Sequence, residues 1–210
     1  MPIALAYVSP AERYPPGWKK ETDDVLASID DGVKFEDTWH AMEAMVDEGL
    51  VHNIGLSNCK ADKVIDVMKY ARIKPAVLQV EMHPFLPQCN LLRFVQSLGV
   101  QITAYSNLGS MGYLEIDWAT AEDSFMLAEP VTSAAAKYGK SAAQVVLRWA
   151  IQRGTCIIPK TVKPARMVEN HDMFDFCLTL KEMEAITMLG CGKRFCDPST
   201  RGMGLPPLFD

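Results

Sequence analysis

The chain has 210 residues, of which 49% are hydrophobic and 22% charged, so it can bury a substantial core, and we expect one soluble globular unit. Its formal net charge of −5, from 21 Lys and Arg against 26 Asp and Glu, argues against a general nucleic-acid-binding protein, because counterion release needs a basic surface. No apolar run approaches the roughly 18 residues of a membrane span, and the N-terminus lacks the basic start of a signal peptide. We therefore expect a cytoplasmic protein that binds neither nucleic acid nor membrane.

Apolar periodicity and end signals predict the helices. The first three cover residues 37–48, 61–71 and 90–98, and glycines end the first and third of these. Two more begin at the capping boxes SAAQ (141–144) and TLKE (179–182) and run to about Gly154 and Gly190. Runs rich in β-branched residues predict strands at 51–57, 76–81, 100–106 and 155–160. This alternation is typical of a parallel sheet with crossover helices. Residues 3–35 and 107–127 interrupt it, and such long loops are usually functional or disordered.

The six cysteines have no spacing that is typical of a zinc site. They stand at positions 59, 89, 156, 177, 191 and 196, without any CxxC. The closest pair, in CGKRFC (191–196), could form a disulfide or half of a metal site, but two unrelated thiols in a reducing cytosol are favoured. We predict no metal site.

Polar side chains occur at the ends of all four predicted strands. The pairs are Ser57 with Asn58, Gln79 with Glu81, Tyr105 with Ser106, and Lys160 with Thr161. One such pair would be an ordinary strand-to-loop feature. Four in register favour a shared ligand site, because the carboxyl ends of parallel strands form the ligand face of α/β folds.

The last strand leads into a predicted anion site. Lys160 supplies a charge, Thr161 a hydroxyl and Arg166 a planar fork for phosphate oxygens, while Pro164 suits the first turn of a short helix. A helix N-terminus also favours negative charge through its free N–H groups. The alternative is a solvated surface turn. Neither a Gly-x-Gly-x-x-Gly nor a Gly-Lys-Ser/Thr motif is present, so a nucleotide would bind without a Rossmann or P-loop cradle.

Four segments resemble the aldo-keto reductases, and the match covers nearly the whole chain as one domain, 1–210. They are IGLSN (54–58), LQVEMHP (78–84), TAYSNLGS (103–110) and IPKTVKPARMVENHDM (158–173). The resemblance implies a (β/α)8 TIM barrel and the cofactor NADP(H).

The resemblance also implies roles for thirteen residues along the cofactor. Ser57, Asn58 and Gln79 would hydrogen-bond the nicotinamide carboxamide, and Tyr105 would stack on the ring. Ser106, Leu108 and Ser110 would line the pyrophosphate, with Lys160, Thr161 and Val162 beside the ribose phosphate. Arg166, Glu169 and Asn170 would hold the adenosine end. Three positions depart from the family pattern: His52 in place of a basic residue, Cys59 in place of an aromatic one, and Asn107 in place of a frequent proline. None of these departures removes a predicted contact.

The family's four catalytic residues, a Tyr, a Lys, an Asp and a His, would all precede Met1 by this alignment, so no catalytic residue is assigned in this chain. We expect the chain to supply strands five to eight of the barrel, with about 120 residues missing upstream. Such a piece would leave open sheet edges and an apolar face in water, which predicts marginal stability or self-association.

The substrate is predicted less directly. PIALAYVSPAERYPPGW (2–18) and RFCDPSTRGMGLPPLFD (194–210) resemble loops of xylose reductases, which makes Trp18 and Cys196 candidate substrate contacts; the alternative is that these residues only pack the loops. The expected function is NADPH-dependent reduction of an aldehyde or aldose, a small carbonyl substrate, by a reductase of which this is a part. The alternatives are a non-catalytic protein that binds NADP(H) or a partner, and a product that does not fold.

Overall fold

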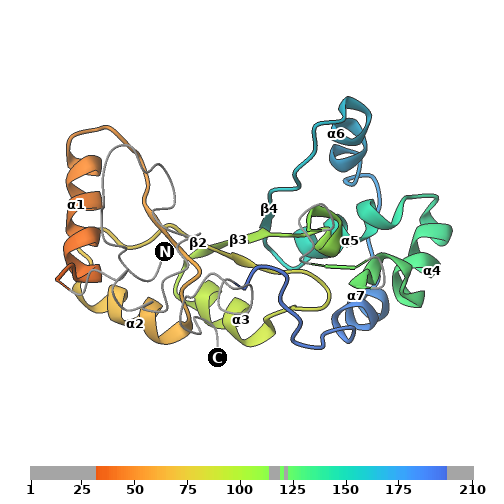
Figure 1. Ribbon diagram of the computed structural model, residues 1–210, viewed down its shortest axis with the longest axis horizontal. Coiled ribbons are helices and arrows are strands. Elements are labelled where there is room, and N and C mark those ends of the chain that lie inside the picture. The colour runs from red at the N-terminus through yellow and green to blue at the C-terminus, as the bar shows by residue number, and fades with distance from the viewer. Residues whose placement is uncertain (1–31, 114–118, 121–122, 198–210) are drawn as a thin grey trace, which may run out of the picture. The chain divides into compact units, whose positions relative to one another are not determined.

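The computed structural model describes residues 32–113, 119–120 and 123–197 (Figure 1). The chain forms two compact units, one of residues 1–78 with 196–210 and one of residues 79–195. The strands are β1 (Gly55–Ser57), β2 (Val77–Glu81), β3 (Gln101–Tyr105) and β4 (Cys156–Ile157). They lie in one parallel sheet in the order β1-β2-β3-β4, so the predicted alternation of strands and helices is confirmed.

The first unit contains helices α1 (Phe35–Asp47) and α2 (Ala61–Tyr70) with strand β1. Trp39 of α1 is buried, and its Nε1 donates to the carbonyl of Ile73 at 3.1 Å. Glu43, one turn further, accepts from the N–H of Ile73 at 2.8 Å, and this hydrogen bond lowers the pKa of the Glu43 carboxyl. Two side chains of α1 thus fix the helix to the loop before β2 through both the carbonyl and the N–H of Ile73.

The second unit contains most of the helices. They are α3 (Cys89–Ser97), α4 (Glu129–Tyr138), α5 (Ala142–Gln152), α6 (Pro164–His171) and α7 (Leu180–Thr187), with short 3₁₀ helices η2 (Gly109–Gly112) and η5 (Phe125–Leu127). Helices α4, α5 and α7 pack together (Figure 1). Their core is centred on Trp149, whose ring is fully buried and whose Nε1 donates to Thr187 Oγ1 at 3.0 Å.

Both predicted capping boxes are present. Ser141 begins α5 and Thr179 begins α7, each accepting from the third helical N–H while Gln144 or Glu182 accepts from the cap residue in return. Burial of Glu182 opposes its ionisation, but hydrogen bonds from Lys137, Thr179 and Tyr138 outweigh burial and lower the Glu182 pKa to about 2. Glu182, which takes part in the capping box of α7, therefore also joins α7 to α4.

Helix α4 was not predicted from the sequence, although its end signals are present. Pro130 lies in its first turn, and Gly139 ends it in the left-handed conformation at φ 62°. Among the described residues, no helix has the length and apolar character needed to cross a membrane, and no cluster of three or more His, Cys, Asp or Glu could hold a metal ion. All six cysteines lie in the described residues, and none of them is paired in a disulfide there.

Gly109 begins η2 at φ 63°, and a Cβ added there would overlap the ring of Phe125. We expect Gly109→Ala to destabilise the protein by about 2–5 kcal/mol, the sum of left-handed strain and overpacking. Gly139→Ala is the matched control, because Gly139 has nearly the same φ but no atom within 4 Å of the added Cβ, so it should cost only about 1–2 kcal/mol. Urea unfolding of both variants measures the difference, and equal losses would contradict the packing argument.

Candidate functional site

Strands β3 and β4 end side by side in the second unit. They pair in parallel with Ala104 opposite Ile157, so the residues that follow each strand leave the sheet at the same edge. The Asn107 side chain joins these two exits, because its Oδ1 accepts from the Ile158 N–H at 3.2 Å. The predicted pyrophosphate loop and the predicted phosphate segment are therefore neighbours.

The loop after β3 has a constrained backbone. Tyr105 is half-buried, and Ser106 adopts a left-handed φ of 56°, which few residues other than glycine accept. The Ser106 hydroxyl is 2.5 Å from the Tyr113 hydroxyl. Leu108 packs against the core and Ser110 is buried. Four predicted cofactor residues thus lie in one turn, with Leu108 and Ser110 contributing to its packing.

The segment after β4 presents cations to solvent. Lys160 and Arg166 are exposed, and neither has a side-chain partner in the part of the chain that the structure describes. Thr161 Oγ1 accepts from the Lys163 N–H at 3.2 Å, which leaves its own hydroxyl proton free to donate. Pro164 begins α6, as predicted. Two cations and a hydroxyl at a helix N-terminus form a donor set that fits a phosphate group.

The remaining residues assigned to the adenosine and phosphate end differ in exposure. Val162 is 76% exposed, Glu169 is half-buried and Asn170 is buried. Arg166 and Asn170 are four residues apart and so lie on the same side of α6, and their different exposure shows that the helix is covered near its C-terminal end and open in its first turns.

The first unit holds the other predicted strand end. Ser57 closes β1 and is half-buried, and Asn58 follows in a left-handed conformation at φ 55°. Cys59 is buried, its Sγ donates to the Ser57 carbonyl, and burial raises the pKa of its thiol. The backbone after β1 therefore repeats the unusual turn seen after β3.

Gln79 lies half-buried within β2. Cys196 is half-buried and is not part of a disulfide among the described residues. Trp18, the other predicted substrate contact, lies outside the described residues.

Glu81, one of the polar residues at the predicted strand ends that favoured a shared ligand site, is not open to a ligand. Its carboxylate is fully buried, and Oε1 lies 3.0 Å from His83 Nε2 and accepts from the Phe195 N–H at 2.6 Å. Arg194 lies 3.9 Å from the other oxygen. The expectation that Glu81 faces a ligand is therefore wrong, because these protein groups surround its carboxylate.

Sequence reasoning did not single out His83. Its ring is fully buried between Phe125, at a centroid distance of 5.6 Å, and Phe195, at 4.9 Å. The two-residue spacing of Glu81 and His83 was an available signal, since such residues lie on the same side of an extended chain. Together they hold the end of the second unit against β2.

The donor set after β4 fits a phosphate group, and the parallel sheet with its helices is an α/β arrangement. The model of the aldo/keto reductase family matches residues 17–190. A probable NAD(P)H-dependent D-xylose reductase of Aspergillus flavus is 44% identical over 207 residues, which are 98% of this chain and 64% of that protein.

Two solved structures are similar in both sequence and fold. The aldose reductase of Schistosoma japonicum is 37% identical with a TM-score of 0.70, and the alignment covers 79% of this chain and 50% of that one. An aldo-keto reductase of Bombyx mori, solved in complex with NADP, is 32% identical with a TM-score of 0.76, covering 83% and 56%.

The chain belongs to the aldo/keto reductase family. Its fold neighbours are (β/α)8 barrels, and the chain itself shows a four-stranded parallel sheet of that fold. It spans 64% of the length of the fungal reductase that it matches.

Proposed function

We propose that this chain is the cofactor-binding part of an NADP(H)-dependent reductase that converts an aldehyde or aldose carbonyl to an alcohol. The observation that carries the proposal is the cluster of Lys160, Thr161 and Arg166 at the start of α6, with both cations exposed and unpaired among the described residues. This donor set suits the 2′-phosphate that distinguishes NADP(H) from NAD(H). The matching fungal proteins are named NAD(P)H-dependent, and the Bombyx mori relative was solved with NADP, which supports the same cofactor.

The residues assigned to the cofactor have proposed roles in binding its different parts. The turn after β3 borders the pyrophosphate through Ser106, Leu108 and Ser110, and Tyr105 stacks on the nicotinamide ring. The hydrogen-bonding groups for the carboxamide are Ser57, Asn58 and Gln79. At the other end of the cofactor, Val162 lies beside the ribose phosphate, and Glu169 and Asn170 hold the adenosine. When bound, the cofactor supplies the hydride that reduces the carbonyl carbon.

We place the proton donor and its supporting residues in sequence beyond these 210 residues, which would make the chain the C-terminal half of the barrel. Three described tyrosines are poorly placed to be this proton donor. Tyr113 and Tyr138 hydrogen-bond to Ser106 and Glu182, and the hydroxyl of Tyr70 is buried. The coverage of relatives is consistent with this placement. On its own the chain would bind cofactor without turnover, and its open sheet edges would favour self-association.

The proposed substrate is a small carbonyl compound, with a pentose aldose as the first candidate. The fungal relatives are named D-xylose reductases. Trp18 and Cys196 remain the proposed substrate contacts. The proposed compartment is the cytoplasm, in agreement with six free thiols.

The test combines binding and turnover. Calorimetric titration of the purified chain is expected to show tighter binding of NADP⁺ than of NAD⁺, and no consumption of NADPH with D-xylose. A protein extended upstream to the length of the relatives should consume NADPH with D-xylose. Absence of NADP⁺ binding would reject the proposal, and binding without turnover by the extended protein would favour the non-catalytic alternative.

A further inference from the structure

Helix α6 carries the proposed phosphate ligand but has little core contact of its own. Residues 164–168 are all exposed, and Asn170 is the one helical residue that is buried. Short helices gain most of their stability from tertiary packing, so an eight-residue helix with this exposure needs another support. The position of Arg166 therefore depends on how α6 is attached.

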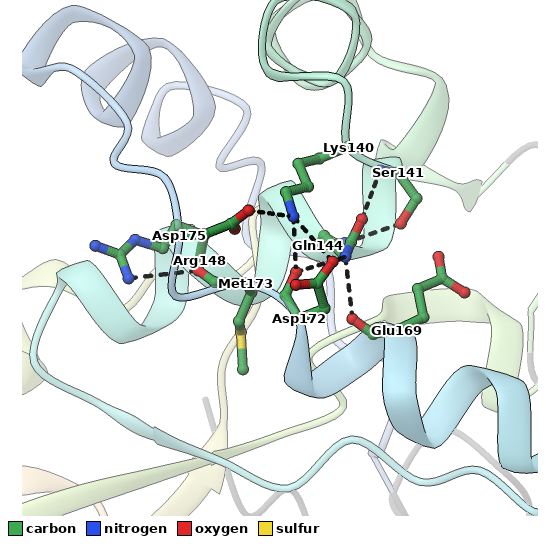
Figure 2. A network of polar contacts seen from close by, with 8 residues as sticks. All are labelled: Lys140, Ser141, Gln144, Arg148, Glu169, Asp172, Met173 and Asp175. Carbon is green, nitrogen blue, oxygen red and sulfur yellow. Dashed lines mark hydrogen bonds and ion pairs between the residues drawn. The ribbon is translucent and has the colours of Figure 1, made fainter.

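The attachment lies at the C-terminal end of α6 and is made by Gln144 of α5 (Figure 2). The Gln144 Nε2 donates to the carbonyls of Glu169, at 3.2 Å, and Asp172, at 2.5 Å. Its Oε1 accepts from the Ser141 N–H at 2.9 Å. The oxygen of this buried amide thus completes the capping box of α5, and its nitrogen donates to carbonyls at the C-terminal end of α6.

Lys140 supports the same end of α6. Its Nζ lies 2.9 Å from Asp172 Oδ2 and 2.8 Å from Asp175 Oδ2, and its side chain is only 11% exposed (Figure 2). Hydrogen bonds to Asp175 and Asp172 raise the pKa of Lys140, and the Lys140 hydrogen bond lowers the pKa of Asp172. The positive charge of the Lys140 ammonium group also interacts favourably with the negative, C-terminal end of the α6 dipole.

We propose that Gln144 and Lys140 are positioning residues for the 2′-phosphate site: they hold α6 where Arg166 can reach the phosphate, without touching the cofactor themselves. The inference rests on the proposed function, because it takes Arg166 as the phosphate ligand. If α6 is correctly placed for only a fraction of the time, the apparent affinity for NADP⁺ is the full affinity multiplied by that fraction. The network is therefore a determinant of cofactor selectivity that lies outside the site.

Gln144→Glu is the sharpest test, since glutamate keeps the oxygen that the capping box of α5 uses but removes the amide donor. We expect NADP⁺ affinity, measured by calorimetry, to fall about tenfold, as if α6 were correctly placed one tenth of the time. NAD⁺, which has no 2′-phosphate for Arg166 to contact, should lose less affinity. Amide hydrogens in α6 should exchange faster in the variant than in the wild-type chain.

Ser141→Ala is the matched control, because it weakens the cap of α5 and leaves the Gln144 amide nitrogen in place. It should change neither the exchange of α6 nor the ratio of NADP⁺ to NAD⁺ affinity. Lys140→Met serves as a second variant should Gln144→Glu fail to fold, and it is expected to shift both measurements in the same direction.

Two results would overturn the inference. One is unchanged exchange in α6; the other is faster exchange with unchanged NADP⁺ affinity. A third result separates this inference from the proposed function: if wild-type and Arg166→Ala chains bind NADP⁺ equally, the phosphate assignment itself is wrong and the inference fails with it. Faster exchange together with selective loss of NADP⁺ affinity, and no effect of Ser141→Ala, supports the inference.

Discussion

Replacing Glu81 with alanine is expected to destabilise the chain by about 2–6 kcal/mol, because each of two buried groups left without its hydrogen-bond partner costs about 1–3 kcal/mol. The substitution leaves the Phe195 N–H and His83 Nε2 without their buried acceptor, and it removes the carboxylate near Arg194. Urea unfolding followed by circular dichroism measures the change through the midpoint and the slope.

Two further variants make the Glu81 result specific. Glu81→Gln keeps an oxygen for the Phe195 N–H at nearly the same size, so it should lose less stability than Glu81→Ala. Glu184→Ala removes an exposed carboxylate from α7 and should change stability by less than about 0.5 kcal/mol. If Glu81→Ala behaved like Glu184→Ala, the buried network would not contribute to stability as argued.

Replacing Arg166 with alanine is expected to weaken NADP⁺ binding by about 10–100-fold, from the loss of a charge-assisted contact of about 1.5–3 kcal/mol. NAD⁺ binding should change much less, because that cofactor lacks the 2′-phosphate. Arg166→Lys should lie between, since a lysine keeps the charge but not the planar fork. Titration of both cofactors into each variant gives the two affinities.

Arg93→Ala is the control for a general loss of positive charge. Arg93 is exposed on α3 and bonds to Asn90 at 2.8 Å, so it is a surface arginine of the same unit outside the proposed site. Its removal should affect NADP⁺ and NAD⁺ alike and only slightly. Equal losses of both cofactors in Arg166→Ala would contradict the 2′-phosphate assignment.

Local signals were sufficient to predict several elements. The Ser141 and Thr179 caps begin α5 and α7 where predicted, because a capping box is formed by residues three apart. The α6 start at Pro164 also follows from local chemistry. The observed strands are shorter than predicted, with β1 beginning at Gly55 and β4 limited to Cys156–Ile157, because strand length depends on pairing partners and not on composition alone.

Long-range contacts could not be predicted in the same way. The capping pattern identified the oxygen of Gln144 but not its amide, whose acceptors at Glu169 and Asp172 lie 25 and 28 residues away. The burial of Glu81 was missed for the same reason, since it results from Phe195 and Arg194 near the other end of the second unit. Such contacts depend on the packed fold, which the periodicity of one segment does not specify.

The contact between Glu81 and Phe195 joins residues 114 positions apart, nearly the full length of the second unit. During synthesis, Glu81 and His83 leave the ribosome long before residues 191–195 exist to cover them. The second unit therefore completes its core only when its last residues emerge, and closing so long a loop slows folding. Until then the nascent chain leaves uncovered the face of the His83 ring that Phe195 contacts at a centroid distance of 4.9 Å, and such incompletely packed chains are prone to aggregate.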